Sequence, residues 1–407
     1  MPDDEPDDQP GDQPDDQVAP LSGLLVLDLT RALAGPHAAM TLGDLGARVI
    51  KVEPPAGDDT RSWGPPFVGP PQDADDGSTV RESTYFLSAN RNKESLVLDL
   101  KSEADRDVLA RLVERADVLM ENYRVGVLDR LGFPVSRLHE LNPRLVVLSI
   151  TGFGHDGPEA NRAGYDQIAQ GEGGLMSITG TEQPTKVGVP IADLIAGMNG
   201  TIGVLAALTE RARTGRGRVV RTSLLAGMVG VHAFQGTRWT VAGEVPGLAG
   251  DHHPSIAPYG MFATASAPIQ IACGSEGLWR ALCGALQWDP EDDGFATNPE
   301  RVAHRDDLVE RLESHFAHQP AEHWLRLLAE AGVPSGKVRS MDDVYSWDQA
   351  LSQGLLLSVE HSTLGRIDLP GSPLRFDDNA FSGGRSSHDP PPTLGEHSDA
   401  IREWLDS

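Results

Sequence analysis

Asp193 is the carboxylate whose neighbours in the sequence most favour chemistry. It lies in the segment VGVPIADLIAG at residues 187–197, next to Ile191, Leu194 and Ile195. A carboxylate among apolar side chains is partly desolvated, which makes it a better nucleophile than a hydrated carboxylate. An Asp before an apolar helical run is also a common helix N-cap. Without further context, the cap is the more frequent role.

Other catalytic motifs do not assemble from this sequence. The turn RALAGPH at residues 31–37 lacks the spaced glycines of a dinucleotide-binding fold. The sequence has no Gly-Lys-Ser/Thr phosphate loop and no Gly-x-Ser-x-Gly nucleophile elbow. His252 and His253 are adjacent, and adjacent side chains on an extended segment point in opposite directions. We therefore expect a loop there rather than a metal site.

The cysteines and the hydropathy pattern indicate an intracellular protein. Cys273 and Cys283 are the only cysteines, too few for a disulfide framework or a four-thiolate metal site. The N-terminal residues lack a basic region followed by an apolar stretch, and no run of about 18 uninterrupted apolar residues follows. We expect a cytoplasmic location and no membrane span.

Short apolar segments alternate with helical patterns in the first half of the 407 residues. Strands are expected at residues 24–29, 46–53, 95–100, 118–120, 144–150 and 218–222, and helices at 37–45, 103–116 and 195–213. Strands that alternate with helices form a parallel, doubly wound sheet. The predicted fold class is therefore α/β.

Composition divides the chain into four parts. Residues 1–17 repeat Pro, Asp and Gln with almost no apolar content, and we expect this acidic tail to be disordered. Residues 18–225 are predicted to form the first part of a large domain. A cluster of Gly, Pro and His followed by amphipathic helices assigns residues 226–340 to a linker and a smaller α+β domain. Residues 341–407 are expected to return to the large domain.

The charge excludes some partners. Sixty acidic and 34 basic residues give a formal net charge of −26, which repels nucleic acids and anionic membranes. Eight of the acidic residues lie in the tail, so most of the negative charge belongs to the rest of the chain, and only five basic residues are Lys. Such a composition fits a halophilic protein, whose carboxylates salt screens from one another, or equally an Arg-rich protein with an ordinary solvated surface.

Ten phrases have an order and spacing that are specific together. They are LSGLLVLDLT at 21–30, AGP at 34–36, LGDLGA at 42–47, VIKVE at 49–53, DLK at 99–101, ADV at 116–118, ENYR at 121–124, LDRLG at 128–132, LNPR at 141–144 and TGRG at 214–217, and the match runs on to LGEH at 394–397. With them the chain resembles the family III CoA-transferases, which include formyl-CoA transferase, carnitine CoA-transferase and the alpha-methylacyl-CoA racemases. The resemblance covers nearly the whole chain after the tail.

This resemblance implies a Rossmann-like large domain made from both chain ends, a smaller inserted domain and an interlocked homodimer. It makes Asp193 the nucleophile that carries CoA, as a covalent aspartyl-CoA thioester, from an acyl-CoA to a carboxylic acid. Coenzyme A thioesters are then substrates, and the reaction requires no permanently bound cofactor and no metal. Residues 250–259, GDHHPSIAPY, resemble the segment of members that act on succinyl-CoA and dicarboxylates such as mesaconate or citramalate.

The resemblance also implies the residues that bind substrates. Those expected to contact CoA are Leu98, Lys101, Asn122, Tyr123, Arg124, Arg130, Leu131, Tyr165 and Asp166. The second carboxylate of a dicarboxylate needs a cation or dense hydrogen bonding, because burial of an unpaired charge is costly. Arg61 and His253 are the candidates for that contact.

Two other functions compete with CoA transfer. The first is a 2-methylacyl-CoA racemase or isomerase, whose members carry a His where this chain has Tyr165. A tyrosine with an ordinary pKa near ~10 cannot readily replace that acid/base group at neutral pH. The second is a non-catalytic acyl-CoA-binding protein with the same fold, and the presence of Asp193 argues against it.

Salt tests the halophilic interpretation of the composition. If the acidic, Lys-poor surface is an adaptation to high salt, screening relieves carboxylate repulsion and the melting temperature rises from low salt into molar KCl. The measurement is a thermal melt at increasing KCl, with removal of the acidic tail as the control, since the tail has no core to stabilise. A melting temperature that stays flat or falls contradicts the adaptation.

Overall fold

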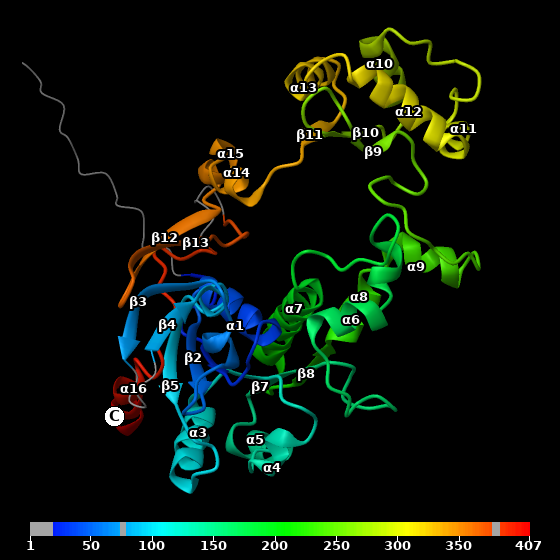
Figure 1. The fold of residues 1–407 in the computed structure, drawn as a ribbon. Helices are drawn as coiled ribbons and strands as arrows, with labels where there is room; N and C mark the ends of the chain where they lie inside the picture. The colour runs from blue at the N-terminus through cyan, green and yellow to red at the C-terminus, as the bar shows by residue number, and fades with distance from the viewer. Residues whose placement is uncertain (1–18, 74–78, 377–382) are drawn as a thin grey trace, which may run out of the picture. The chain divides into compact units, whose positions relative to one another are not determined.

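The computed structural model describes residues 19–73, 79–376 and 383–407. Their contacts group them into two compact units (Figure 1). Unit 1 contains the described residues up to Ala169, with Pro190–Met228 and Asp348–Ser407, and unit 2 contains Gln170–Val189 and Val229–Trp347. We predicted residues 170–189 in the large domain, whereas their contacts group them with unit 2. The tail predicted to be disordered, residues 1–17, lies outside the described residues.

Unit 1 is built on a six-stranded parallel sheet with the strand order β5-β2-β1-β6-β7-β8. The strands are β1 (Leu25–Asp28), β2 (Arg48–Glu53), β5 (Lys93–Val97), β6 (Val118–Glu121), β7 (Val146–Thr151) and β8 (Val219–Ser223). Nearly every residue of β1, β2, β6 and β7 is buried, which explains their continuous apolar runs. The mixed α/β class with a parallel central sheet is therefore confirmed.

The strand order creates a switch point between β1 and β6. From β1 the chain runs outward through β2 to β5, and it then returns to β6 on the other side of β1 before β7 and β8. In open α/β sheets, ligands bind outside the carboxyl ends of the strands at such a point. The residues that follow β1 and β6 are thus the first place to look for a site.

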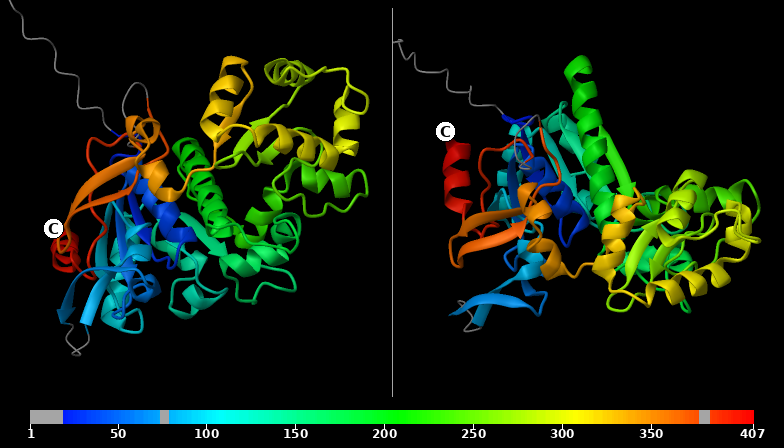
Figure 2. Two further views of the ribbon diagram at one scale, coloured as in Figure 1. Left: turned by 45° about the horizontal axis from the view of Figure 1, so that its top comes forward. Right: turned by 90° about the horizontal axis from the view of Figure 1, so that it is seen from above.

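One group of helices shares a core with the strands. It comprises α3 (Glu103–Arg115), α5 (Val135–Leu141) and α16 (Ser398–Asp406). Leu112, Leu138 and Ile401 of these helices belong to one buried cluster with Leu27 and Leu119 of the strands. Figure 2 shows α16, at the red end of the chain, beside the sheet, where it contacts β5. The C-terminus therefore completes the core that the first half of the chain begins.

Two further helices, α1 (Ala34–Asp44) and α7 (Ile191–Thr214), pack against each other. Gly197 permits their close approach, because a Cβ at this position would lie 2.5 Å from the carbonyl oxygen of Ala34. Figure 1 shows both helices on the side of the sheet opposite α3 and α5. The contact fixes the first turns of α7 next to the start of α1.

Within the described residues, α7 is the one helix long and apolar enough to cross a membrane by length and composition. It contains no uninterrupted run of about 18 apolar residues, because Asn199 and Thr201 interrupt its apolar sequence. Core helices meet the same criterion, and α7 packs against α1, β7 and β8.

The remaining elements of unit 1 include two antiparallel hairpins and short helices. The hairpins pair β3 (Phe67–Asp73) with β4 (Thr79–Ser83) and β12 (Leu356–His361) with β13 (Gly365–Pro370). The short helices are η1 (Asp59–Ser62), α2 (Thr84–Leu87), α4 (Val127–Arg130) and α15 (Asp348–Ser352).

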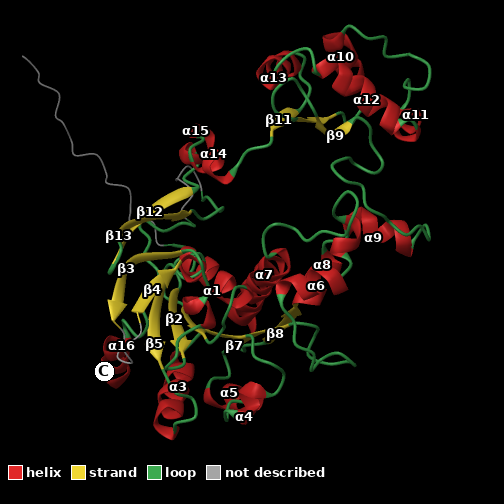
Figure 3. Cartoon of the chain, in the orientation of Figure 1, coloured by secondary structure: helices red, strands yellow, loops and turns green. Residues whose placement is uncertain are grey.

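Unit 2 is an α+β arrangement around its own core (Figure 3). Its antiparallel sheet has the order β11-β10-β9, from β9 (Tyr259–Phe262), β10 (Ile269–Ala272) and β11 (Ser335–Lys337). Its helices are α9 (Ala233–Thr240), α10 (Glu276–Leu286), α11 (Asn298–Ala303), α12 (Arg305–Phe316), α13 (Ala321–Glu330) and α14 (Met341–Tyr345). Ile271, Trp279 and Phe316 are among the residues that this core buries.

Two buried ion pairs lie at the sheet: one ties the segment after β2 to β2, and the other joins β5 to β1. Lys51 Nζ lies 2.8 Å from Asp58 Oδ2 and also donates to the carbonyl oxygen of Thr30 at 3.0 Å. Lys93 Nζ lies 2.9 Å from Asp28 Oδ2. All four charged side chains are fully buried. An unpaired charge in such a place is costly, so each pair fixes the backbone that carries it.

Candidate active site

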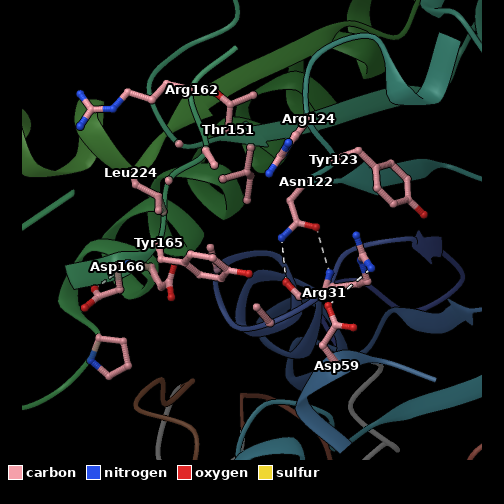
Figure 4. Close-up of a pocket in the computed structure, with 18 of the residues that line it drawn as sticks. Arg31, Asp59, Asn122, Tyr123, Arg124, Thr151, Arg162, Tyr165, Asp166 and Leu224 are labelled. Atoms are coloured by element: carbon pink, nitrogen blue, oxygen red, sulfur yellow. Dashed lines mark hydrogen bonds and ion pairs between the residues drawn. The ribbon is translucent and has the colours of Figure 1, made fainter. Parts of the chain in front are cut away.

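A cavity of about 410 Å³ in unit 1 lies at the switch point. Its lining includes Arg31 after β1, Asn122 after β6 and Thr151 at the end of β7, together with Asp193 in the first turn of α7. Asn122 joins the two sides of the switch point, because its side chain accepts the Arg31 N–H at 2.9 Å and donates to the Arg31 carbonyl oxygen at 2.7 Å (Figure 4).

Asp193 is not the N-cap of its helix. We predicted a helix from residue 195, but α7 begins at Ile191, after Pro190 at the N-cap position. Asp166 supplies the missing acceptor from another element, since its Oδ1 accepts the N–H groups of Ala192 at 2.8 Å and Asp193 at 3.4 Å. The Asp193 side chain is thus not required as a cap, and it lines the cavity.

The electrostatics of Asp193 are unusual for an aspartate. Burial, followed by repulsion from the Asp166 carboxylate, raises its pKa to about 7. Its place in the first turn of α7 acts in the opposite direction, because a helix N-terminus stabilises negative charge. A half-buried carboxylate that ionises near neutral pH is poorly solvated once it is charged, which suits a nucleophile or a base.

Tyr85 and Trp63 also line the cavity, and sequence reasoning missed both. Their rings lie 5.1 Å apart in an edge-on arrangement. Burial, with the charges of Asp193 and Asp166, raises the pKa of Tyr85 to about 12, so its hydroxyl stays protonated and can donate a hydrogen bond. Neither residue belongs to a periodic pattern in the sequence that could have identified it.

The cavity gathers five of the nine residues predicted to contact CoA: Asn122, Tyr123, Arg124, Tyr165 and Asp166. Figure 4 shows Tyr165 and Asp166 on one side of this cavity and Asn122 and Arg124 across it. Tyr165 has 65% of its surface exposed.

The other four predicted CoA contacts lie outside the lining of this cavity. Leu98 is buried in the core of unit 1, and Leu131 packs against the same core. Lys101 is exposed just before α3, and Arg130 is exposed at the end of α4. The structure therefore does not bring these four together with Asp193.

The guanidinium of Arg61, predicted to contact a substrate carboxylate, is bound by partners within unit 1 and does not line this cavity. Its Nη2 and Nε lie 2.7 and 2.8 Å from the two carboxylate oxygens of Glu53. The same group donates to the carbonyl oxygen of Pro392 at 3.2 Å and lies 3.7 Å from the centroid of the Phe86 ring. The cations that line the cavity are instead Arg31, Arg124 and Arg162.

His253 belongs to unit 2, where its ring stacks against the rings of Phe234 and Tyr259 at centroid distances of 5.3 and 5.2 Å. Its Nδ1 accepts the N–H of Ser255 at 3.1 Å. Burial, with repulsion from Arg305, lowers the pKa of His253. Within the described residues, no group of three or more His, Cys, Asp or Glu side chains could hold a metal ion.

Comparisons with known proteins show the family to which the chain belongs. The sequence model of CoA-transferase family III matches residues 21–398. Succinyl-CoA:glutarate CoA-transferase of Mus musculus is 39% identical over 93% of this chain and 84% of its own length. Succinyl-CoA:mesaconate CoA-transferase of Haloarcula hispanica is 37% identical over 93% and 94%. The crystal structure of a CAIB/BAIF family protein from Brucella suis superposes with a TM-score of 0.83, at 40% identity over 96% and 100%.

The raised pKa of Asp193 predicts a pH-dependent cost in stability. Between pH about 4 and about 7 the folded protein holds this proton and the unfolded chain does not. The free energy of unfolding of the wild type therefore falls with rising pH relative to that of Asp193→Asn. Above pH about 7 this gap, the difference in unfolding free energy between the two proteins, stays constant. Urea unfolding of both proteins across this range measures the gap.

Asp166→Asn is the matched control for that titration. The substitution removes the charge that repels Asp193 but keeps an oxygen for the Ala192 N–H. It should therefore lower the pKa of Asp193, and the pH above which the gap in unfolding free energy stays constant should fall with it. Parallel stability curves for wild type and Asp193→Asn between pH 4 and 8 would contradict the assignment.

Proposed function

Because the chain belongs to CoA-transferase family III and is an acyl-CoA:carboxylate CoA-transferase, we propose that Asp193 is its nucleophile and that its acceptor is a dicarboxylate. The observation that carries the proposal is the half-buried Asp193 carboxylate, with a pKa near 7, in the cavity at the switch point. At neutral pH a large fraction of this group is ionised yet poorly hydrated, as a nucleophile requires.

The proposed reaction has four acyl-transfer steps and no net proton change. An Asp193 oxygen attacks the thioester carbon of the donor, CoA thiolate leaves, and a mixed anhydride forms. The thiolate then attacks the aspartyl carbonyl, which releases the donor acid and leaves an aspartyl-CoA thioester. The acceptor carboxylate attacks that thioester and expels the thiolate, which finally attacks the acceptor carbonyl of the new anhydride. The acceptor leaves as its CoA thioester, and Asp193 is free again.

Each step passes through a tetrahedral intermediate that carries an oxyanion, so hydrogen-bond donors near Asp193 matter most. Tyr85 is such a donor, because its pKa of about 12 keeps the hydroxyl protonated. Tyr165, which lines the same cavity, offers a second hydroxyl. The transferase names of the relatives and the tyrosine at position 165 both disfavour the racemase alternative.

The names of the relatives support a dicarboxylate acceptor, since glutarate and mesaconate each carry two carboxylates. While one carboxylate reacts, the other remains charged and needs a cation. Arg61 is paired with Glu53, so Arg31 is the better candidate: it is exposed in the cavity, and its ion pair with the exposed Asp59 is 3.5 Å long. We assign Arg124, beside Asn122, to the CoA moiety.

The interlocked homodimer and the cytoplasmic location also remain proposals. Exposed apolar side chains support a subunit contact; they include Met198 and Ile202 on α7 and Trp239 on α9. The Haloarcula hispanica relative supports the halophilic interpretation. The proposed chemistry uses no resident cofactor, because the reacting groups are a side-chain carboxylate, a thioester and an acid.

Loss of the carboxylate tests the nucleophile. Asp193→Ala and Asp193→Asn should lose CoA transfer while they keep the fold, because neither side chain can form an anhydride. With acyl-CoA and hydroxylamine, mass spectrometry of the wild type should find position 193 modified. Asp399→Asn, in the first turn of α16, is the control and should retain activity. Near wild-type turnover in either Asp193 variant, or modification elsewhere alone, would reassign the nucleophile.

The acceptor class has its own test. Arg31→Ala should raise the KM for glutarate, succinate or mesaconate by about 10- to 100-fold, the loss of one charge-assisted hydrogen bond, and should change the KM for a monocarboxylate of similar length far less. Arg31→Lys should restore part of the preference for dicarboxylates. Arg162→Ala, which removes another cation that lines the cavity, is the control and should not change the KM for dicarboxylates selectively. A wild type that prefers monocarboxylates, or an Arg31→Ala effect equal for both classes, would contradict the dicarboxylate assignment.

A further inference from the structure

A second cavity of about 380 Å³, which we call the side cavity, adjoins the active-site cavity in unit 1. The residues that line both cavities are Tyr123, Arg124, Val125 and Thr151. Residues 123–125 thus form a partition between two spaces. Side chains that border a cavity on each side gain less from packing than core side chains do, so hydrogen bonds must hold the partition in place.

Glu121, the last residue of β6, provides one of these hydrogen bonds. Its Oε2 accepts the N–H of Tyr123 at 2.8 Å, and its Oε1 accepts the hydroxyl of Ser149. Glu121 and Ser149 are register partners on neighbouring parallel strands, so their side chains emerge on the same face of the sheet. Each is only 8% exposed, and a buried carboxylate without such partners is costly.

His155 completes this cluster from the loop after β7. Thr151 Oγ1 accepts the N–H of Gly154 at 3.1 Å, and Gly154 has a φ of 115°, which favours glycine. This turn brings His155 Nε2 to 2.7 Å from Ser149 Oγ. The single hydroxyl proton of Ser149 is donated to the Glu121 carboxylate, so Ser149 Oγ can only accept from His155. An imidazole N–H of His155 then donates to Oγ and orients the hydroxyl. Burial, with repulsion from Arg221, lowers the pKa of His155 and favours the neutral ring.

We infer that Ser149 and His155 are positioning residues for acyl-CoA binding: they fix the Glu121 carboxylate and, through it, the partition that forms one wall of the active-site cavity. Both lie outside the lining of that cavity, so they act through Glu121 rather than on the reacting atoms. The inference rests on the proposed function, because it takes residues 122–124 as a contact for acyl-CoA.

Steady-state kinetics of the full-length enzyme test this role. Ser149→Ala should raise the KM for acyl-CoA about three- to tenfold, the effect of one hydrogen bond, with kcat within about twofold and the KM for the acceptor acid unchanged. Ser149→Thr keeps the hydroxyl and should restore the KM. His155→Ala should act like Ser149→Ala, and His155→Gln, which keeps a hydrogen-bonding end, should act less.

A general loosening of unit 1 needs a separate control. Asn142 Nδ2 donates to the carbonyl oxygens of Val113 and Ala116 at 3.0 and 2.7 Å, outside the lining of both cavities. Asn142→Ala should therefore lower the melting temperature without a change in the KM for acyl-CoA. Any of three results would overturn the inference. They are an equal rise of this KM in Asn142→Ala, a loss in kcat of Ser149→Ala that matches its change in KM, and a failure of Ser149→Thr to restore the KM.

Arg124→Ala separates this inference from the proposed function. If Arg124→Ala raises the KM for acyl-CoA and Ser149→Ala does not, the positioning role fails and the assignment of the cavity stands. If neither variant changes this KM, the cavity does not bind acyl-CoA and both fail. Should Ser149→Ala not fold, the two His155 variants decide by the same criteria.

Discussion

The site depends on charges that are buried in and beside the parallel strands. Lys51 with Asp58, and Lys93 with Asp28, lie fully inside unit 1, and each charge is tolerable only with its partner in place. Lys51 also holds the carbonyl oxygen of Thr30, one residue before Arg31 enters the cavity. The segments after β1 and β2 are thus fixed by charge pairing rather than by packing alone, and the cavity takes its shape from segments that cannot easily move.

A second constraint acts at the start of α7. A helix that begins after a proline lacks a side-chain cap, and Asp166 supplies the acceptor from another element. The same carboxylate repels Asp193 and adds to the desolvation that raises its pKa. One residue therefore orders the first turn of the helix and makes the neighbouring carboxylate harder to ionise. This pair of aspartates links the stability of the helix to the reactivity of the site, because Asp166, which completes the helix start, also disfavours charge on Asp193.

The wall formed by residues 123–125 is held in a different way. Residues 123–125 have a cavity on each side, and their position depends on the hydrogen bond that Glu121 accepts from Tyr123 and on the reciprocal bonds between Asn122 and Arg31. Unit 1 thus combines one wall anchored by buried ion pairs with another anchored by neutral and charge-assisted hydrogen bonds. Such a wall can be altered by single substitutions that leave the hydrophobic core intact.

The sequence by itself determined the features that depend on local pattern. Buried strands read as apolar runs, so the parallel α/β sheet was predictable, and the family phrases identified a CoA-transferase with a candidate nucleophile at Asp193. Only the tertiary structure decided which groups meet. Arg61 binds Glu53, Leu98 enters the core, and Tyr85 reaches the cavity through contacts between residues far apart in the chain. Side-chain partners and desolvation follow from such long-range packing, which hydrophobic periodicity does not encode.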